Sequence, residues 1–234
     1  MSDGLQRVMA IIAHADDAEF GFAGTIAKWA REGKEITYVV VTNGNKGSSD
    51  PTTTQEMLAA VREREQRAAC AVLGVRNVLF LGYPDGELEP TMRLRRDLTR
   101  VIRRHRPDIA LVPDPTTWYL GNSYINHPDH RAVGEAALAA IYPSARDRLT
   151  FPELLGEGLE PLKVQEVYLT VTNDPDVWID ISGTIDVKVA ALREHRSQLD
   201  DPDAAERMVR EWAAANAAGH EMRYAERFKR MILP

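Results

Sequence analysis

Two short clusters of histidine and aspartate carry the residue types that metal-assisted hydrolysis needs. The first, His14-Ala15-Asp16-Asp17, follows an apolar run at residues 8–13, and the second is His127-Pro128-Asp129-His130. Two histidines, one carboxylate and one water form a well-attested zinc site, and zinc lowers the pKa of a water bound to it to about 7. A further carboxylate nearby can take a proton from water and pass it to a leaving group. These residues therefore predict hydrolysis of an amide or an ester.

The spacing within each cluster indicates which side chains converge. His14 and Asp17 lie three residues apart at a turn, so both can approach one metal ion while Asp16 points beside it. His127 and His130 have the same separation at the expected start of a helix, so they share one face. Each cluster alone is a weak signal, because adjacent aspartates often form turns and two helical histidines can simply be solvated.

The elements that must position these clusters follow an α/β pattern. Short apolar runs alternate with segments of helical periodicity, which predicts a mostly parallel sheet covered by helices. Active sites of such sheets lie beyond the carboxyl ends of the strands, where the first cluster is placed. Strands are expected at residues 7–13, 35–42, 77–81 and 108–113, with weaker candidates at 165–171 and 177–181. Helices are expected at residues 24–33, 54–73, 91–105, 128–141, 184–198, 203–218 and 221–231.

Composition bounds the class of protein. The 234 residues suit one domain, residues 1–234, and the net charge of −6 offers no basic face for nucleic acid. No apolar run is long enough to cross a membrane, so we expect a cytoplasmic protein. The single cysteine, Cys70, excludes an internal disulfide and a cysteine-based zinc site. His195 and His220 lie among charged residues, and we expect both at the surface.

Taken together, these segments resemble the LmbE/PIG-L family of zinc-dependent N-acetylglucosaminyl deacetylases. That family carries Ala-His-Pro-Asp-Asp after its first strand and a later His-Pro-Asp-His, where this chain has residues 13–17 and 127–130. The likeness continues through residues 42–47, 62–75, 84–88 and 186–198, in the right order over most of the chain. Ala15 is a departure, since it stands where the family has proline.

The resemblance implies a fold and a division of roles. The fold is a Rossmann-like three-layer sandwich with a mostly parallel sheet and a C-terminal extension of helix and strand. Zinc is implied as the cofactor, although Fe²⁺, Co²⁺ and Ni²⁺ also suit such ligands. Asp129 matches a carboxylate that orients a histidine. The implied zinc ligands are His14, Asp17 and His130, with Asp16 as general base and His127 as oxyanion stabiliser or general acid.

The implied substrate is a small N-acetylated amino sugar or glycoconjugate, which loses acetate and keeps a free amine. Arg62 is similar to an arginine that approaches the substrate in relatives. Asn43 and Lys46 follow the second strand and can contact hydroxyls, and Trp118 lies in a long loop, at residues 114–127, where it can stack on a sugar. Some relatives place a tyrosine two residues before the later histidine motif, and here Tyr124 lies one residue further away.

Three alternatives stay open. An amidase would cleave a different bond, such as the amide of a thiol–sugar conjugate. A nucleotide-sugar transferase could hold a metal–diphosphate on Asp16 and Asp17, but this leaves His127 and His130 unexplained. A dinucleotide-binding module is disfavoured, because the first strand is followed by anionic residues and not by the G-x-G-x-x-G pattern. A homo-oligomer is compatible with each of these alternatives.

Overall fold

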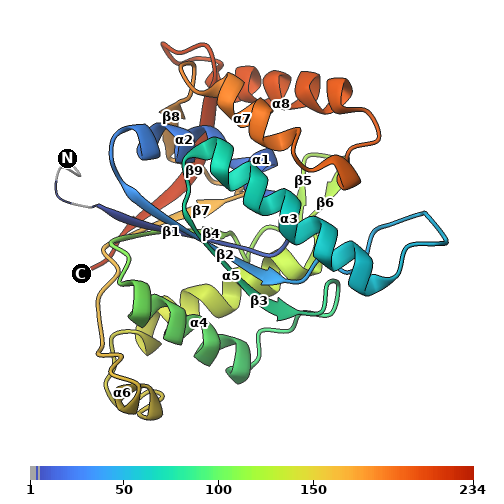
Figure 1. Cartoon of the computed structure of the whole chain (residues 1–234). Helices are drawn as coiled ribbons and strands as arrows, with labels where there is room; N and C mark the ends of the chain where they lie inside the picture. Colours follow the sequence, from blue (N-terminus) through green and yellow to red (C-terminus); the bar gives the residue numbers. More distant parts are fainter. Residues whose placement is uncertain (1–3, 5) are drawn as a thin grey trace.

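A seven-stranded sheet lies at the centre of the computed structural model, which describes residue 4 and residues 6–234 (Figure 1). The first five strands of the order run parallel, and β9 is antiparallel to both β7 and β8. The order is β3 (Asn77–Tyr83), β2 (Glu35–Thr42), β1 (Arg7–Ile12), β4 (Ile109–Pro113), β7 (Glu166–Thr170), β9 (Ala225–Ile232) and β8 (Val177–Asp180). The six expected strands are confirmed, as is the mostly parallel sheet.

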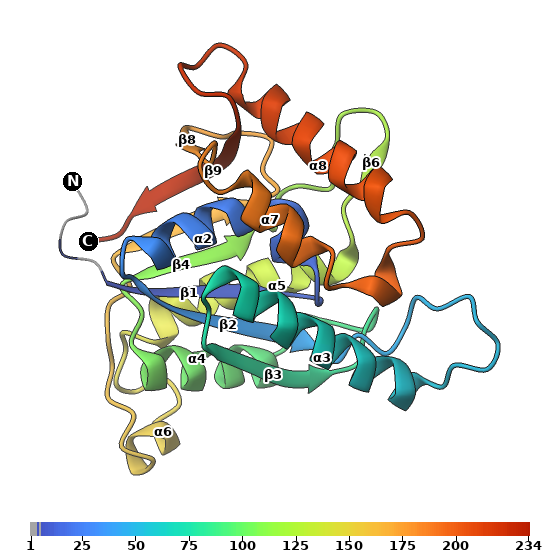
Figure 2. The same cartoon turned by 45° about the horizontal axis from the view of Figure 1, so that its top comes forward.

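Helices cover both faces of this sheet, which makes three layers. On β1, Met9 and Ile11 pack toward α4 (Met92–His105) and α5 (Pro128–Ala139), while Ile12 packs on the opposite face. That opposite face is covered by α2 (Ala23–Arg31), α3 (Gln55–Leu73) and α7 (Ile185–Leu192), as Figures 1 and 2 show. Because both faces are buried, β1 is a continuous apolar run and does not alternate with polar residues.

The helices begin and end at residues that suit those positions. Thr54 and Thr91 cap α3 and α4, each accepting a hydrogen bond from a backbone N–H three residues on. Gly74 ends α3 with a φ of 81°, a left-handed conformation that glycine adopts at low cost. Pro128 occupies the first turn of α5, where its missing N–H loses no hydrogen bond. These local signals explain why the predicted helix bounds lie close to the observed ones.

The C-terminal third departs from the expected helices in two places. The segment 221–231 was expected to be a helix, and this is wrong: β9 (Ala225–Ile232) is a strand inserted between β7 and β8. Two of its charged residues have partners in the fold, since Glu226 pairs with Lys188 and Arg230 with Glu166. The expected helix 184–198 is shorter, ending as α7 before a single turn at Arg196–Gln198. The helix α8 (Pro202–Ala217) is confirmed and packs on α7.

The shortest elements were not predicted, because a helix of fewer than two turns or a strand of two residues leaves no recognisable periodicity in the sequence. They are α1 (Asp17–Gly21), α6 (Glu153–Gly156), and the hairpin of β5 (Tyr119–Leu120) and β6 (Tyr124–Ile125). Of these, α1 and the hairpin flank the site described below. Among the described residues, no helix is both long and apolar enough to cross a membrane.

The order of the strands reverses at β1. The chain proceeds from β1 to β2 and β3 on one side and then returns to place β4 on the other side of β1. In open α/β sheets, such a reversal opens a crevice beyond the carboxyl ends of the two central strands. The segments that follow β1 and β4, residues 13–17 and 114–127, carry or lead into the two histidine clusters. The fold therefore brings together clusters that are more than a hundred residues apart in the chain.

Candidate active site

Asp17 links the first cluster to the second. Its Oδ2 accepts hydrogen bonds from the backbone N–H groups of Ala13 at 3.0 Å and His14 at 2.8 Å. Its Oδ1 lies 3.0 Å from Nε2 of His130 and 3.6 Å from Nδ1 of His14. One oxygen thus closes the turn after β1, and the other faces two imidazole nitrogens. Although burial opposes ionisation, His130 and His14 hold the pKa of Asp17 well below its usual value.

The outer nitrogens of both histidines are already occupied by hydrogen bonds. His130 Nδ1 lies 2.9 Å from Oδ1 of Asn126, whose own amide donates to the carbonyl of Thr117 at 2.7 Å. Asn126 therefore presents its oxygen, which fixes the proton of His130 on Nδ1 and leaves Nε2 free as a ligand. His14 is held in the same manner through Nε2, 3.1 Å from Oδ2 of Asp129.

The donor set fits a divalent metal ion. His14, Asp17 and His130 each offer one ligand atom, and these atoms lie within 4.8 Å of one another. Two imidazoles and a carboxylate, with their outer atoms hydrogen-bonded, match the ligands of catalytic zinc sites. Burial disfavours a charged His14, but the charge of Asp17 and the contacts with Asp129 and Asp85 outweigh it and raise its pKa to about 12. The same negative field favours a bound cation.

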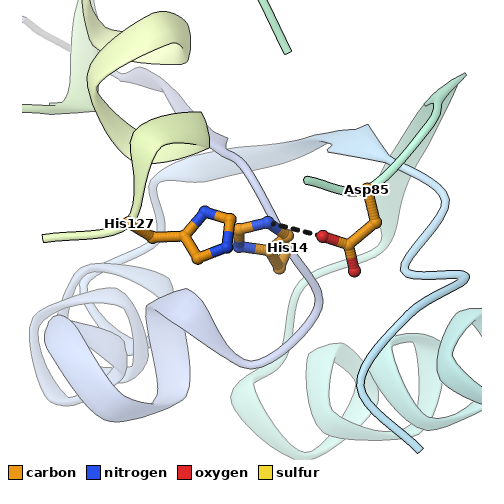
Figure 3. Close-up of side chains that lie close together, drawn as sticks. All are labelled: His14, Asp85 and His127. Carbon is orange, nitrogen blue, oxygen red and sulfur yellow. Dashed lines mark ion pairs between the residues drawn. The ribbon is translucent and has the colours of Figure 1, made fainter. Parts of the chain in front are cut away.

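Asp129 and Asp85 share His14. Asp85 Oδ1 also lies 3.1 Å from Nε2 of His14, and Figure 3 shows His14 between Asp85 and His127. Asp129 is fully buried and accepts two further hydrogen bonds, from the N–H of Gly86 at 2.7 Å and of Leu88 at 3.2 Å. These donors fix the Asp129 carboxylate, so the histidine that it orients is His14.

Asp16 is placed differently from Asp17. Its backbone has a φ of 92°, in the left-handed region, and its side chain projects into a pocket of about 290 Å³ that His14, Arg62, Asp85 and His127 also line. Burial raises the pKa of Asp16 to about 7, against the lowering effect of Arg62. A carboxylate with a pKa near neutrality can both accept a proton from water and return it. Asp16 therefore has the placement and the acidity of a general base.

His127 presents a neutral N–H donor to the same pocket. Its Nδ1 accepts a hydrogen bond from the backbone N–H of Asp129 at 3.2 Å, at the N-terminus of α5. The proton of the neutral ring is therefore on Nε2. Burial and the positive charge of His14 lower the pKa of His127, which keeps the ring neutral. The ring packs edge-on against His14 with a centroid separation of 4.7 Å. This arrangement suits stabilisation of an oxyanion near the metal ligands.

Arg62 and Lys46 are the two cations that line the pocket. The Arg62 guanidinium, carried by α3, donates to the carbonyl of Ala15 at 2.8 Å and lies 3.4 Å from both Asp16 Oδ2 and Asp85 Oδ2. It is nearly fully buried, so it braces the turn after β1 as well as facing the pocket. Lys46 is more exposed and pairs with Glu87 at 2.6 Å.

The other expected substrate residues lie around the pocket and do not line it. Asn43 uses its side-chain oxygen within its own loop, accepting from the N–H of Asn45 at 3.1 Å. Trp118 is 63% exposed, and the Arg131 guanidinium stacks over its ring at 3.9 Å. Tyr124, on β6, is 42% exposed, and burial together with the charges of Asp17 and Asp16 raises its pKa.

The sequence argument missed several residues of the site. Asp85 follows β3 directly and could have been found by the rule that was applied to β1. Asn126 and Gln198, which orient His130 and line the pocket respectively, carry no sequence signal of their own. The expectation that His195 lies at the surface is wrong, because its side chain is fully buried and 3.2 Å from Glu19. His220 is exposed, as expected.

Comparison with known proteins gives consistent matches. The sequence profile of the PIG-L family, described as GlcNAc-PI de-N-acetylase, matches residues 9–141, which include both histidine clusters. Diacetylchitobiose deacetylase of Thermococcus kodakarensis is 34% identical over 197 residues, which cover 84% of this chain and 72% of that protein. A probable N-acetyl-alpha-D-glucosaminyl L-malate deacetylase 2 of Bacillus anthracis is 29% identical, covering 83% and 82%.

The fold has a solved counterpart of the same kind. The structure of N,N'-diacetylchitobiose deacetylase from Pyrococcus horikoshii, in complex with an inhibitor, superposes with a TM-score of 0.90. The identity is 33%, and the match covers 98% of this chain and 85% of that chain. The three-layer arrangement, including the antiparallel β9 and α8, is therefore shared over nearly the whole chain.

Proposed function

This chain belongs to the PIG-L family, and from that premise we propose that it removes the acetyl group from an N-acetylglucosamine-type sugar or glycoconjugate. It is a metal-dependent deacetylase, releasing acetate and a free amine. The observation that supports the reaction best is the separation of Asp17, with both carboxylate oxygens engaged, from Asp16, which faces the pocket beside it. One carboxylate is free to move protons while the other is committed to the ligand cluster.

We assign the metal to His14, Asp17 and His130, and we propose zinc as the native ion. When bound, such an ion lowers the pKa of a coordinated water to about 7 and polarises a carbonyl oxygen. The charge and hydrogen bonding of the three ligands support this assignment, and they also suit Fe²⁺, Co²⁺ and Ni²⁺. Asp129 orients His14 for this role, and Asn126 orients His130.

The residues around the ligands have separate tasks in the proposed reaction. Asp16 takes a proton from the attacking water while the oxygen of that water adds to the acetyl carbonyl carbon. His127 donates its Nε2–H to the oxyanion that forms on the carbonyl oxygen. The carbon–nitrogen bond then breaks, and the proton held by Asp16 passes to the departing amine. The products are acetate and the amino sugar, so no co-reactant besides water is consumed.

The rim of the pocket is the proposed place of sugar recognition. Arg62 and Lys46 line the pocket and can donate hydrogen bonds to hydroxyls. Tyr124 is proposed as a further substrate contact, because the charges of Asp17 and Asp16 raise its pKa. Asn43 and Trp118 do not line the pocket, and we propose that they contact a part of the substrate that extends beyond the reacting sugar. Exposed aromatic rings beside a pocket suit stacking against a pyranose face.

We propose that residues 1–234 form one catalytic unit, and we predict a cytoplasmic location. The ligands come from the segments after β1 and β4, and α7 packs against α1 and α3, which carry Asp17 and Arg62. The single cysteine is buried and unpaired, as is usual in a reducing compartment.

An acetate-release assay tests the proposal. Metal-stripped protein and protein reloaded with zinc, iron, cobalt or nickel are compared on N-acetylglucosamine, diacetylchitobiose and N-acetylglucosaminyl glycosides. We expect equal amounts of acetate and free amine from at least one of these, and only after reloading. Release of a larger acid from a thiol–sugar amide, without acetate from any sugar, would favour the amidase. Turnover of neither class by the reloaded protein would overturn the proposal.

A further inference from the structure

A buried polar cluster lies behind the turn that carries Asp16. We define it as the support cluster, consisting of Glu19 on α1, Gln66 on α3 and His195 just after α7. The side chains of all three are fully buried, and none of them lines the pocket. Glu19 and His195 form an ion pair at 3.2 Å, although burying charged groups costs free energy. The proposed reaction does not use this pair, so its presence calls for a separate explanation.

The support cluster reaches Asp16 through one peptide group. The N–H of Asp16 donates to Oε1 of Gln66 at 3.2 Å, and the carbonyl of Ala15 accepts from Arg62 at 2.8 Å. That N–H and that carbonyl belong to the same peptide group. Arg62 and Gln66 are four residues apart on α3, so they lie on one face of the helix and hold this peptide from both ends.

The grip on this peptide matters because Asp16 adopts a costly conformation. Its φ of 92° lies in the left-handed region, which residues with a side chain rarely adopt and which persists only when the surroundings fix it. The orientation of the peptide between Ala15 and Asp16 sets the φ of Asp16, and in the observed conformation Asp16 lines the pocket. The hydrogen bonds that this peptide makes with Gln66 and Arg62 hold it in that orientation.

Glu19 decides which way the Gln66 amide faces. A carboxylate only accepts hydrogen bonds, so Glu19 Oε1 requires the NH₂ group of Gln66, which lies 3.2 Å away. The amide oxygen of Gln66 must then point in the other direction, toward the N–H of Asp16. His195 compensates the buried charge of Glu19 from the opposite side. Although burial opposes it, the Glu19 carboxylate raises the pKa of His195, which favours the charged ring.

We propose that Glu19 and His195 are positioning residues, which fix the Gln66 amide and thereby hold Asp16 in its left-handed conformation with its carboxylate aimed at the pocket. The inference rests on the proposed function in one respect, namely that Asp16 is the general base. The pair acts through Gln66 and touches neither substrate nor metal. Its loss should therefore change the catalytic step and leave binding of the metal and the sugar intact.

Exchange of the two polar side chains gives the sharpest test. In Gln66→Glu, two carboxylates face each other, so the hydrogen bond to Asp16 is lost or weakened. In the double variant Glu19→Gln/Gln66→Glu, Gln at position 19 donates to the new Glu and still accepts from His195. The Glu at position 66 again offers an acceptor to the Asp16 N–H. We expect Gln66→Glu to lose about 10²-fold in kcat, the scale of a misplaced catalytic group, and the double variant to recover most of it.

Two further readouts separate positioning from a merely structural role. The KM for the sugar and the metal content should stay at the wild-type values in Gln66→Glu, because neither set of contacts changes. Glu63→Gln, on the exposed face of the same helix one turn earlier, is the matched control and should leave kcat unchanged. If the single and double variants differ only in Tm, with equal kcat per metal-loaded folded molecule, the positioning role is overturned.

Amide hydrogen exchange tests the inference without any activity. In metal-free protein, the N–H of Asp16 should exchange more slowly in the wild type and the double variant than in Gln66→Glu. His195→Leu should speed the exchange as well, since Glu19 loses its compensating charge. Equal exchange in all four proteins would refute the proposal whether or not the chain releases acetate. Slow exchange in the wild type together with no acetate release would count against the proposed function alone.

Discussion

Both ends of β1 are held by an aspartate in the same way, but the two aspartates differ in the partners of their second oxygen. At the amino end, Asp108 Oδ2 accepts the backbone N–H groups of Gln6 at 3.0 Å and Arg7 at 2.9 Å. At the carboxyl end, Asp17 Oδ2 accepts those of Ala13 at 3.0 Å and His14 at 2.8 Å. In each case one carboxylate oxygen binds two consecutive N–H groups and pins the strand end.

The second oxygen makes the difference. Asp108 Oδ1 lies 3.2 Å from the guanidinium of Arg7, which cannot give up its proton. Asp17 Oδ1 faces the nitrogens of His14 and His130, which can exchange protons for a metal ion. We therefore propose that Asp17 is a metal ligand because of the partners of its second oxygen, and not because of the turn that its first oxygen closes.

Exchange of each carboxylate for an amide should separate the two ends most clearly. Asp17→Asn keeps an oxygen for the turn but presents NH₂ to His130, so we expect metal affinity to fall by more than the roughly 100-fold that losing an outer partner costs. Deacetylation should then fall to background. Asp108→Asn should bind metal like the wild type. Chelator competition measures both affinities, and equal losses in the two variants would break the comparison.

The neighbouring carboxylate should matter for the rate alone. Asp16→Asn preserves the left-handed turn, because asparagine tolerates positive φ better than most residues. Loss of the base should lower kcat by about 10²–10⁴-fold with metal content unchanged. Acetate release by fully loaded protein is the measurement. Turnover close to wild type would show that Asp16 is not the base.

The oxyanion donor should come next in size. His127→Ala removes the Nε2–H and should lower kcat by about 10²–10³-fold, with little change in KM. His127→Asn serves as the control for the helix cap, since asparagine is a favoured residue at that position. If His127→Asn were fully active, the role of His127 would be limited to capping α5.

An outer partner of the metal site should have a smaller effect. Asp129→Asn leaves all three ligands in place but presents an NH₂ group to His14 or loses the bond to its Nε2–H. We expect a metal affinity about 10–100-fold weaker, measured by chelator competition, and activity restored by added metal. An unchanged affinity would mean that Asp85 alone orients His14.

The smallest effect concerns acid stability at the far end of β1. Burial raises the pKa of Asp108, but the N–H groups of Arg7 and Gln6 and the Arg7 guanidinium outweigh it and hold the pKa below its usual value. A lowered folded pKa contributes stability above the unfolded value near 3.9, and this is lost as the pH falls through the folded pKa. The Tm difference between wild type and Asp108→Asn should therefore shrink from pH 6 toward pH 3. A constant difference would contradict this account.

The order of strands and helices could be predicted from the sequence, because burial on both faces of the sheet leaves recognisable apolar runs in its strands. After Arg7, β1 is an apolar run, and β2 is buried and rich in β-branched residues from Ile36 to Thr42, while capping residues mark the helices. The sequence also predicted that His14 and His130 lie at the same edge of the sheet, because the order and direction of the strands determine this. What it missed depends on the direction of single side chains.

His195 and β9 show why the remainder was out of reach. The neighbours of His195 in the chain, Glu194 and Arg196, are at least partly exposed. The composition of this segment therefore indicated an exposed histidine, whereas the His195 side chain is buried. The charged residues of β9 interrupt any apolar pattern that would predict a buried strand, but Glu226 is buried and pairs with Lys188 at 2.6 Å. In both cases the deciding partner lies in another element, and no local pattern encodes it.

The insertion of β9 between β7 and β8 has a consequence for synthesis. In the part of the chain that the structure describes, β8 pairs with β9 and with no other strand, so it cannot join the sheet until residues 225–232 have been translated. The same strand supplies Glu226, which binds the N–H groups of Gly24 and Thr25 at the start of α2. The residues proposed to hold the metal precede β9 in the chain and are therefore synthesised before the strand that contacts the start of α2. We expect a nascent chain to contain all three ligand residues before β8 can join the sheet, and we expect chains that stop before Ala225 to be degraded by proteases.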